Sequence, residues 1–233
     1  MVPTYERALI VGAGDGLSAS LARALAGAGL RVGLAARNAG KLAGLAAETG
    51  AATHGADASR PGDVDGLFAA MDEALGGSPD VVAYNPSARV RGPLVSLDRD
   101  AVRQALEVSA YGGFLVAQAA ARRMLPNRHG AILFTGASAS LKGFAGSAPF
   151  AMGKFALRGL AQSLARELSP QGIHVAHAII DGAIRNPGRA EPAGAPDSML
   201  DPDAIARTYL AVLAQDRSGW SFEFEVRPWV ETF

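Results

Sequence analysis

Short apolar runs alternate with helical patterns along the whole chain of 233 residues. This alternation is typical of βαβ units, which build a parallel sheet with helices on both faces. Strands are expected at residues 8–11, 31–36, 51–55, 80–84, 131–135, 174–180 and 222–226, and helices at about 17–28, 38–49, 61–76, 98–125, 149–168 and 202–214. Asp98, Asp201 and Asp203 are expected to cap helices or to lie in their first turns. We therefore predict a doubly wound α/β fold with seven parallel strands.

No repeat of solenoid period and no dividing linker interrupts this pattern, so residues 1–233 are expected to form a single domain. The stretch Asn186–Asp201 is rich in Pro, Gly and Ala, and it connects the sixth strand to the last helix. Ligands of open parallel sheets bind beyond the carboxyl ends of the strands. We predict a lid-like loop at about residues 183–201, and an ordinary surface loop is the alternative.

Composition excludes several classes of partner. The 22 basic and 22 acidic residues leave no formal net charge, so no overall field attracts nucleic acid or an anionic membrane. Cysteine is absent, which excludes disulfides, thiolate metal sites and cysteine nucleophiles. His174 and His177 lie on one predicted strand and point to opposite faces. We therefore expect no nucleic acid, membrane or metal partner.

The N-terminal residues 1–7 lead directly into the first strand, without a basic segment followed by an apolar core and a cleavage site. This start is not that of a secreted protein. No apolar run approaches the roughly 20 residues of a membrane span. The sequence predicts a cytoplasmic protein.

A glycine-rich loop, Gly12-Ala13-Gly14-Asp15-Gly16-Leu17-Ser18, joins the first strand to the first helix. Glycines in this position allow a tight turn, and they let a pyrophosphate approach the helix N-terminus, where N–H groups and the helix dipole favour anions. The candidate cofactor-binding residues here are Gly12, Gly14, Asp15, Gly16 and Leu17. A glycine turn without a ligand is the alternative.

Two residues bear on the choice of nucleotide. Arg37 follows the second strand with no acidic residue before it, where a carboxylate would accept the ribose 2′-hydroxyl of NAD. This favours NADP, although a carboxylate at Asp15 would repel a 2′-phosphate. NADP is the preferred cofactor, NAD stays open, and Arg37 has a solvated surface role as its alternative.

The segment Phe150-Ala151-Met152-Gly153-Lys154 opens the predicted helix at 149–168, which Ser169-Pro170-Gln171-Gly172-Ile173 follows. With the glycine-rich loop, these segments resemble the short-chain dehydrogenase/reductase family, and the resemblance extends from end to end. It implies a Rossmann-like fold in which Lys154 contacts the nicotinamide ribose. The further cofactor contacts that it implies are Asp57 at the adenine, Asn85 after the fourth strand, and Gly182 and Ile184 near the carboxamide.

The family's Asn, Ser, Tyr and Lys relay is altered in this chain. By resemblance the Asn falls on Ser109, the Ser on Ala137 beside Ser138, and the Tyr on Phe150, which has no proton to give. Only Lys154 matches the family pattern. Lys154 with a lowered pKa, or a water held by Ser109 or Ser138, could replace the missing donor. Tyr111 is on the same helix as Ser109 but is turned about 200° away. The candidate catalytic positions are thus Lys154, Ser138, Ser109 and Phe150.

These residues lead to three functional hypotheses. The first is an NAD(P)-dependent oxidoreductase that acts on a small carbonyl or alcohol substrate with a non-standard proton relay. The second is a non-redox enzyme that performs an elimination, isomerisation or cyclisation on the same scaffold, and the third is a non-catalytic NADP-binding sensor. The resemblance also implies a homodimer or homotetramer that pairs the fourth and fifth helices.

Overall fold

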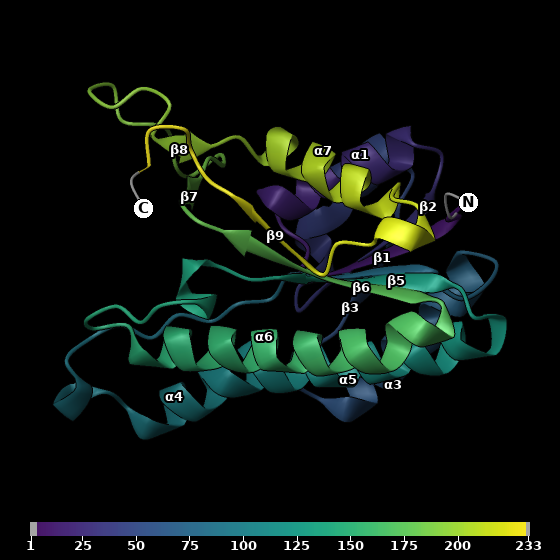
Figure 1. The fold of residues 1–233 in the computed structure, drawn as a ribbon, viewed down its shortest axis with the longest axis horizontal. Helices are drawn as coiled ribbons and strands as arrows, with labels where there is room; N and C mark the ends of the chain where they lie inside the picture. The colour runs from purple at the N-terminus through teal and green to yellow at the C-terminus, as the bar shows by residue number, and fades with distance from the viewer. Residues whose placement is uncertain (1–3, 232–233) are drawn as a thin grey trace.

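A computed structural model describes residues 4–231, and within them seven parallel strands form the main sheet (Figure 1). The strands are β1 (Arg7–Val11), β2 (Arg31–Ala36), β3 (Ala52–Gly55), β4 (Val81–Tyr84), β5 (Gly130–Thr135), β6 (Ile173–Ile180) and β9 (Glu223–Val226). Their order is β3-β2-β1-β4-β5-β6-β9, and every neighbouring pair is parallel. The predicted fold class is confirmed.

Helices cover both faces of this sheet, as Figure 1 shows: α1 and α7 lie on one face, and α3, α4, α5 and α6 lie on the other. The helices are α1 (Leu17–Gly27), α2 (Ala43–Thr49), α3 (Pro61–Ala74), α4 (Arg99–Leu106), α5 (Gly112–Met124), α6 (Ala148–Leu168) and α7 (Pro202–Leu213). All residues of β4, β5 and β6 are buried. A central parallel strand is covered on both faces, which is why its sequence is continuously apolar.

The order of the strands reverses between β1 and β4. The chain winds outward from β1 to β3 and then returns to place β4 beside β1. Such a switch point opens a crevice at the carboxyl ends of the two strands. The Asn85 N–H donates to the Val11 carbonyl at 3.0 Å, which joins the two strand ends at this crevice. The fold therefore places the glycine-rich loop and Asn85 together.

Two of the expected caps form. The Asp98 carboxylate accepts from the Ala101 N–H at 2.7 Å, and the Asp201 carboxylate accepts from the Asp203 N–H at 3.0 Å. Each satisfies an N–H group that the first helical turn leaves without a backbone partner. Asp203 itself lies in the first turn of α7.

Two predicted helices differ from the structure. The helix expected at 98–125 is interrupted by a π turn at Glu107–Tyr111, between α4 and α5. The helix expected at 38–49 is a 3₁₀ turn at Ala39–Leu42 followed by the short α2. The Asn38 side chain accepts from the Gly40 N–H at 3.0 Å, and this local turn competes with an α-helical start.

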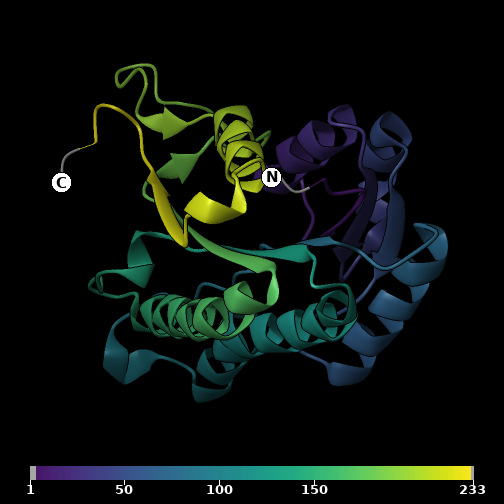
Figure 2. The ribbon, with the colours of Figure 1, turned by 45° about the vertical axis from the view of Figure 1, so that its right-hand side comes forward.

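The segment predicted as a lid-like loop contains regular structure. Two short strands, β7 (Ala183–Ile184) and β8 (Met199–Leu200), pair in parallel, and the Arg185 N–H donates to the Leu200 carbonyl at 2.9 Å. Figure 2 shows these strands apart from the main sheet and beside the start of α7. Backbone pairing thus fixes both ends of the excursion, which the Pro and Gly content alone did not indicate. Within residues 4–231, no helix has the length and apolar character that a membrane span requires.

Candidate functional site

A cavity of about 880 Å³ lies at the carboxyl ends of β1, β4, β5 and β6. The glycine-rich loop borders one side, and the residues after β4, the turn after β5 and the start of α6 border the other. Of the predicted site residues, those that line the cavity are Gly12, Gly14, Asp15, Gly16, Leu17, Asn85, Ser138, Phe150, Lys154, Gly182 and Ile184. The fold thus brings most of the predicted cofactor residues to one cavity.

Gly12 has a backbone that only glycine adopts without strain, with φ of +82°. A methyl group on its Cα would lie 2.6 Å from the Pro86 nitrogen, so the space at this turn has no room for a side chain. At the other end of the loop, Gly16 precedes α1, and no side chain caps this helix. The uncapped N-terminus leaves backbone N–H groups for an anion at the cavity wall.

Ser18 joins the glycine-rich loop to the segment after β4. Its hydroxyl donates to the Gly12 carbonyl at 3.2 Å and accepts from the Asn85 side-chain amide at 2.6 Å. The sequence suggested no role for Ser18 beyond packing. This role could have been predicted from the sequence, because Ser18 is a polar residue in the first turn of a helix that begins at the switch point.

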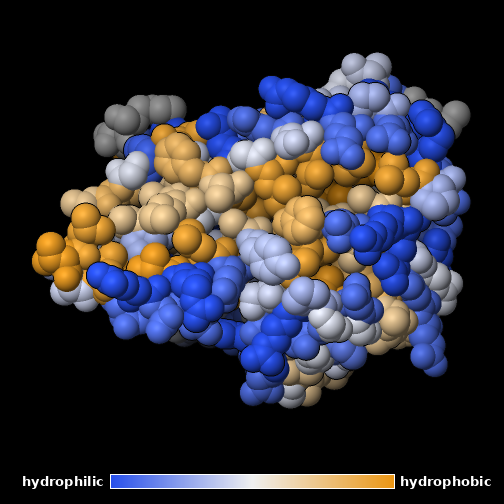
Figure 3. All heavy atoms as spheres, turned by 90° about the horizontal axis from the view of Figure 1, so that it is seen from below, coloured by the Kyte–Doolittle hydropathy of each residue, from blue (hydrophilic) through white to orange (hydrophobic). Residues whose placement is uncertain are grey.

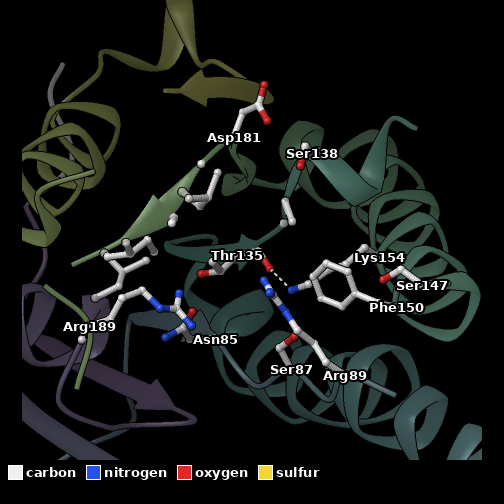
Figure 4. A pocket seen from close by; sticks show the side chains of 18 of the residues that line it. Asn85, Ser87, Arg89, Thr135, Ser138, Ser147, Phe150, Lys154, Asp181 and Arg189 are labelled. Atoms are coloured by element: carbon white, nitrogen blue, oxygen red, sulfur yellow. Dashed lines mark hydrogen bonds between the residues drawn. The ribbon is translucent and has the colours of Figure 1, made fainter. Parts of the chain in front are cut away.

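Lys154 reaches the cavity from the first turns of α6, and its exposed fraction is 2%. Its Nζ donates to the Thr135 carbonyl at the end of β5, at 2.6 Å (Figure 4). Burial, and to a lesser extent the nearby charge of Arg89, lower the pKa of Lys154 to about 7. The protein alone therefore brings the pKa of this amine close to neutral pH, as its predicted role as a replacement proton donor requires.

Phe150 lies one helical turn before Lys154 and is 7% exposed. The guanidinium carbon of Arg89 is 4.4 Å from the centre of the Phe150 ring, and Lys154 Nζ is 6.0 Å from it. Figure 4 shows the Arg89 side chain beside the ring and close to the end of Lys154. A cation over an aromatic face is attracted by the ring quadrupole. The sequence reasoning missed Arg89, because nothing in the chain order relates residue 89 to residue 150.

Ser109 does not reach the cavity. It is fully buried in the π turn, and its hydroxyl accepts from the Ala88 N–H at 3.3 Å. A methyl group on Gly153 would lie 2.7 Å from Ser109 Cβ, so the turn packs tightly against α6. Ser109 therefore positions the segment that carries Arg89 and does not contact a substrate. Tyr111 is 46% exposed and is not among the residues that line the cavity.

The turn after β5 carries Ala137 and Ser138, and both line the cavity. The Ala137 N–H donates to the Ser140 hydroxyl at 3.2 Å, so Ser140 holds the turn from below. His177 is fully buried beneath it, with Nε2 3.5 Å from the Ser140 hydroxyl and Nδ1 3.0 Å from the Glu223 carboxylate. This buried network supports the cavity floor.

Arg37 and Asp57 lie outside the cavity lining. Arg37 is exposed. The Asp57 carboxylate accepts from the backbone N–H and the hydroxyl of Ser59, at 3.0 and 2.7 Å, and so stabilises the turn after β3. Lys41, which the sequence reasoning missed, lies closer to the loop: its Nζ would be 3.9 Å from a methyl group at Gly14.

The remaining polar groups give no metal centre in the part of the chain that the structure describes. His174 donates through Nε2–H to the Ser221 carbonyl at 2.9 Å and stacks on Trp220, with ring centres 4.7 Å apart. His177 is held by Ser140 and Glu223. Within residues 4–231, no group of three or more His, Cys, Asp or Glu side chains is placed to hold a metal ion.

The sheet and its cavity define a doubly wound α/β protein with a glycine-rich loop at the switch point. A family model described as enoyl-(acyl carrier protein) reductase matches residues 12–216. The chain belongs to the short-chain dehydrogenase/reductase family.

Three similar proteins illustrate this membership. A solved structure of a short-chain dehydrogenase from Rhodopseudomonas palustris is 36% identical, with 97% of this chain and 100% of that chain covered and a TM-score of 0.84. A metagenomic short-chain oxidoreductase in complex with NADP is 25% identical, with 97% and 98% covered and a TM-score of 0.82. Short chain aldehyde dehydrogenase 1 of Euphorbia lathyris is 32% identical over 164 residues, which are 68% of this chain. The matched segments span about half or less of the length of this relative and of two other curated relatives.

Proposed function

We propose that the protein is an NADPH-dependent oxidoreductase that reduces a small carbonyl substrate with a proton from Lys154. The observation that carries this proposal is the buried amine of Lys154, which faces the cavity between the glycine-rich loop and Phe150. An amine with a pKa of about 7 is matched to proton transfer at neutral pH.

The residues around the cavity fit a dinucleotide. Gly14 and Gly16 line the cavity without side chains, and the nearest atoms to a Cβ at these positions would be 3.9 and 3.8 Å away. The uncapped N-terminus of α1 suits a pyrophosphate. Asn85 and Ser18 hold the loop to the strand ends, and Lys154 is placed for the nicotinamide ribose. When bound, the nicotinamide supplies the hydride.

NADP is preferred to NAD in this proposal. Arg37 follows β2 with no acidic residue just before it in the sequence, and Lys41 Nζ lies 3.9 Å from the position of a Cβ on Gly14. These two cations are the proposed partners of a 2′-phosphate. Asp15 opposes them with one carboxylate. The relative in complex with NADP supports the same choice.

The chain's own residues account for the proton. As the hydride adds to the carbonyl carbon, the electron pair of the C=O double bond moves to oxygen, and Lys154 Nζ gives a proton to form the alcohol. The Thr135 carbonyl, which accepts from Nζ at 2.6 Å, fixes the amine in place, and solvent returns its proton. Phe150 and Ala137 line the cavity without a hydroxyl.

Hydride transfer to a panel of aldehydes and ketones tests the proposal. Purified protein is expected to oxidise NADPH in the presence of at least one carbonyl compound, which is measured as a loss of absorbance at 340 nm. The rate is expected to be higher at pH 6.5 than at pH 8.5, because Lys154 must be protonated to donate. Heat-denatured protein is the control. If NADPH binds tightly and no compound is reduced, a non-redox enzyme or a nucleotide-binding sensor becomes the better account.

The face formed by α5 and α6 supports association with a second copy. Its exposed apolar side chains include Tyr111, Phe114, Met152 and Phe155, with exposed fractions of 41 to 51%. Figure 3, which shows the molecule from below, displays a broad hydrophobic area on this side. We infer that two or four chains pair through this face, as the sequence resemblance implied.

Light scattering tests this association. The wild-type protein is expected to have twice or four times the mass of one chain at micromolar concentration. Replacing both Phe114 and Phe155 with glutamate is expected to reduce the mass to one chain, because the charges would be buried without partners. The exposed Leu94→Glu variant, outside this face, is the control. A wild-type monomer would contradict the inference.

A further inference from the structure

Three arginines border the cavity without a carboxylate partner. Arg89 and Arg91 belong to the segment after β4, and Arg189 belongs to the excursion between β7 and β8. Within residues 4–231, none of their guanidinium groups takes part in an ion pair, and Arg89 contacts the Phe150 ring instead. Guanidinium groups are the side chains best suited to bind carboxylates and phosphates through paired hydrogen bonds.

The three charges act on one another. Burial lowers the pKa of Arg89, and the charges of Arg91 and Arg189 lower it further. Like charges at short range raise the energy of the site until an anion neutralises them. The cations are therefore placed for a negative group, and no carboxylate within residues 4–231 forms an ion pair with them.

Carboxylates also border the cavity, but they are engaged or located elsewhere. Asp15 belongs to the glycine-rich loop, and Asp181 lies 3.7 Å from Arg227. Glu231 is on the C-terminal segment after β9. In the described part of the chain no ion pair joins these groups to Arg89, Arg91 or Arg189.

Arg89 is held in place before any ligand binds. The Ser109 hydroxyl accepts from the N–H of Ala88, the preceding residue, at 3.3 Å. The Phe150 ring supports the guanidinium at 4.4 Å from the ring centre. Phe150 is thus a platform for a cation at the position where the family's phenol would lie. A fixed donor loses less entropy on binding than a mobile one.

Figure 4 separates the two sides of the cavity. Arg89 lies with Phe150 and Lys154, whereas Arg189 lies across the cavity beside Asn85. Since Asn85 is hydrogen-bonded to Ser18 of α1, Arg189 is on the side of the glycine-rich loop. Arg89 is therefore the arginine nearest to the reacting end of a substrate, and Arg91 follows it at the rim.

We propose that Arg89 and Arg91 form an anion-binding subsite, so that the substrate is an oxo-acid or another carbonyl compound with a carboxylate or phosphate group. The carbonyl group of this substrate rests on the proposed function. The anion subsite itself is tested by ligand binding, without catalysis. Phe150 acts in it as a positioning residue for Arg89.

Calorimetry with oxo-acids of three to six carbons, each compared with its methyl ester, tests the subsite in protein saturated with NADP⁺ and in protein without nucleotide. At least one acid is expected to bind about tenfold or more tightly than its ester. Arg89→Met is expected to remove this preference, since a lost charged hydrogen bond costs roughly a factor of 10 to 100 in affinity. Arg91→Met is expected to reduce it, and the exposed Arg207→Met on α7 is the matched control.

Substitutions of Phe150 show whether its ring positions Arg89 or contacts the ligand itself. Phe150→Leu is expected to weaken acid binding while ester binding stays the same, and Phe150→Tyr, which keeps an aromatic face, is expected to retain the acid preference. Equal binding of every acid and its ester would overturn the proposal, as would an Arg89→Met variant that keeps the preference. A parallel loss of NADP⁺ affinity in that variant would assign the arginines to the nucleotide phosphates instead. Acid binding without hydride transfer would overturn the proposed reduction and leave the subsite standing.

Discussion

The Phe150→Tyr variant is expected to reduce simple aldehydes and ketones about tenfold faster than the wild-type protein. The gain stays below the 10² to 10⁴ of a general acid added to a site that has none, because Lys154 already donates a proton. The new hydroxyl would lie one helical turn before Lys154, whose Nζ is 6.0 Å from the centre of the Phe150 ring. In the family that this chain belongs to, a tyrosine and a lysine at this spacing form the acid of the relay. Steady-state rates of NADPH oxidation measure the gain.

The control for this variant is Leu94→Tyr, which places the same hydroxyl on an exposed side chain outside the cavity and outside the face formed by α5 and α6. It is expected to have the wild-type rate. If Phe150→Tyr binds NADPH normally and gains no rate, Ala137 is also limiting, and the double variant with Ala137→Ser should then show the gain. No gain in either variant would contradict a reductase geometry at this cavity.

The Lys154→Met variant is expected to lose carbonyl reduction by a factor of about 10² to 10⁴, because it removes the proton donor of the proposed reaction. Its nucleotide affinity should also fall, since Lys154 is the residue placed for the nicotinamide ribose. Lys154→Arg keeps a positive charge but holds its proton at all ordinary pH values. It is expected to bind NADPH better than Lys154→Met and to be equally slow.

The pH dependence of the wild-type rate shows whether Lys154 acts as the proton donor. A donor with a pKa of about 7 is protonated below pH 7 and loses its proton above it. The rate of reduction should therefore be level below pH 7 and fall by about tenfold per pH unit above it. Any residual rate of the Lys154→Arg variant should lack this fall. A wild-type rate that rises from pH 6 to pH 9 would contradict Lys154 as the donor.

The sequence predicted the sheet well because its central strands are buried on both faces. Continuous apolar runs, such as β4 and residues 131–134 of β5, predict buried strands because no exposed face requires polar residues. The turn at Gly12 could also be predicted from the sequence, since its φ of +82° requires glycine. The break between α4 and α5 could not be predicted in this way. The π turn at residues 107–111 adds a residue to one helical turn, and it contains no proline or glycine that would mark it in the sequence.

That π turn also explains why the catalytic side was predicted less well than the nucleotide side. It buries Ser109 against Gly153 and directs its hydroxyl to the Ala88 N–H, so a residue aligned with the relay contacts the backbone instead. The pairing of Arg89 with Phe150 depends on the same segment. Contacts of this kind arise from tertiary packing, and a pattern along one element does not encode them.

The salt bridge between α6 and the last strand has a consequence for the synthesis of the protein. Arg158 lies one helical turn after Lys154, and its guanidinium binds the Glu223 carboxylate at 2.7 and 2.8 Å. The same carboxylate bonds to His177, beneath the turn that carries Ala137. A nascent chain that has not yet released β9 from the ribosome leaves both groups without this partner. The Arg158–Glu223 contact, which adds to the Lys154 hydrogen bond to β5, therefore forms only after translation has reached the last strand.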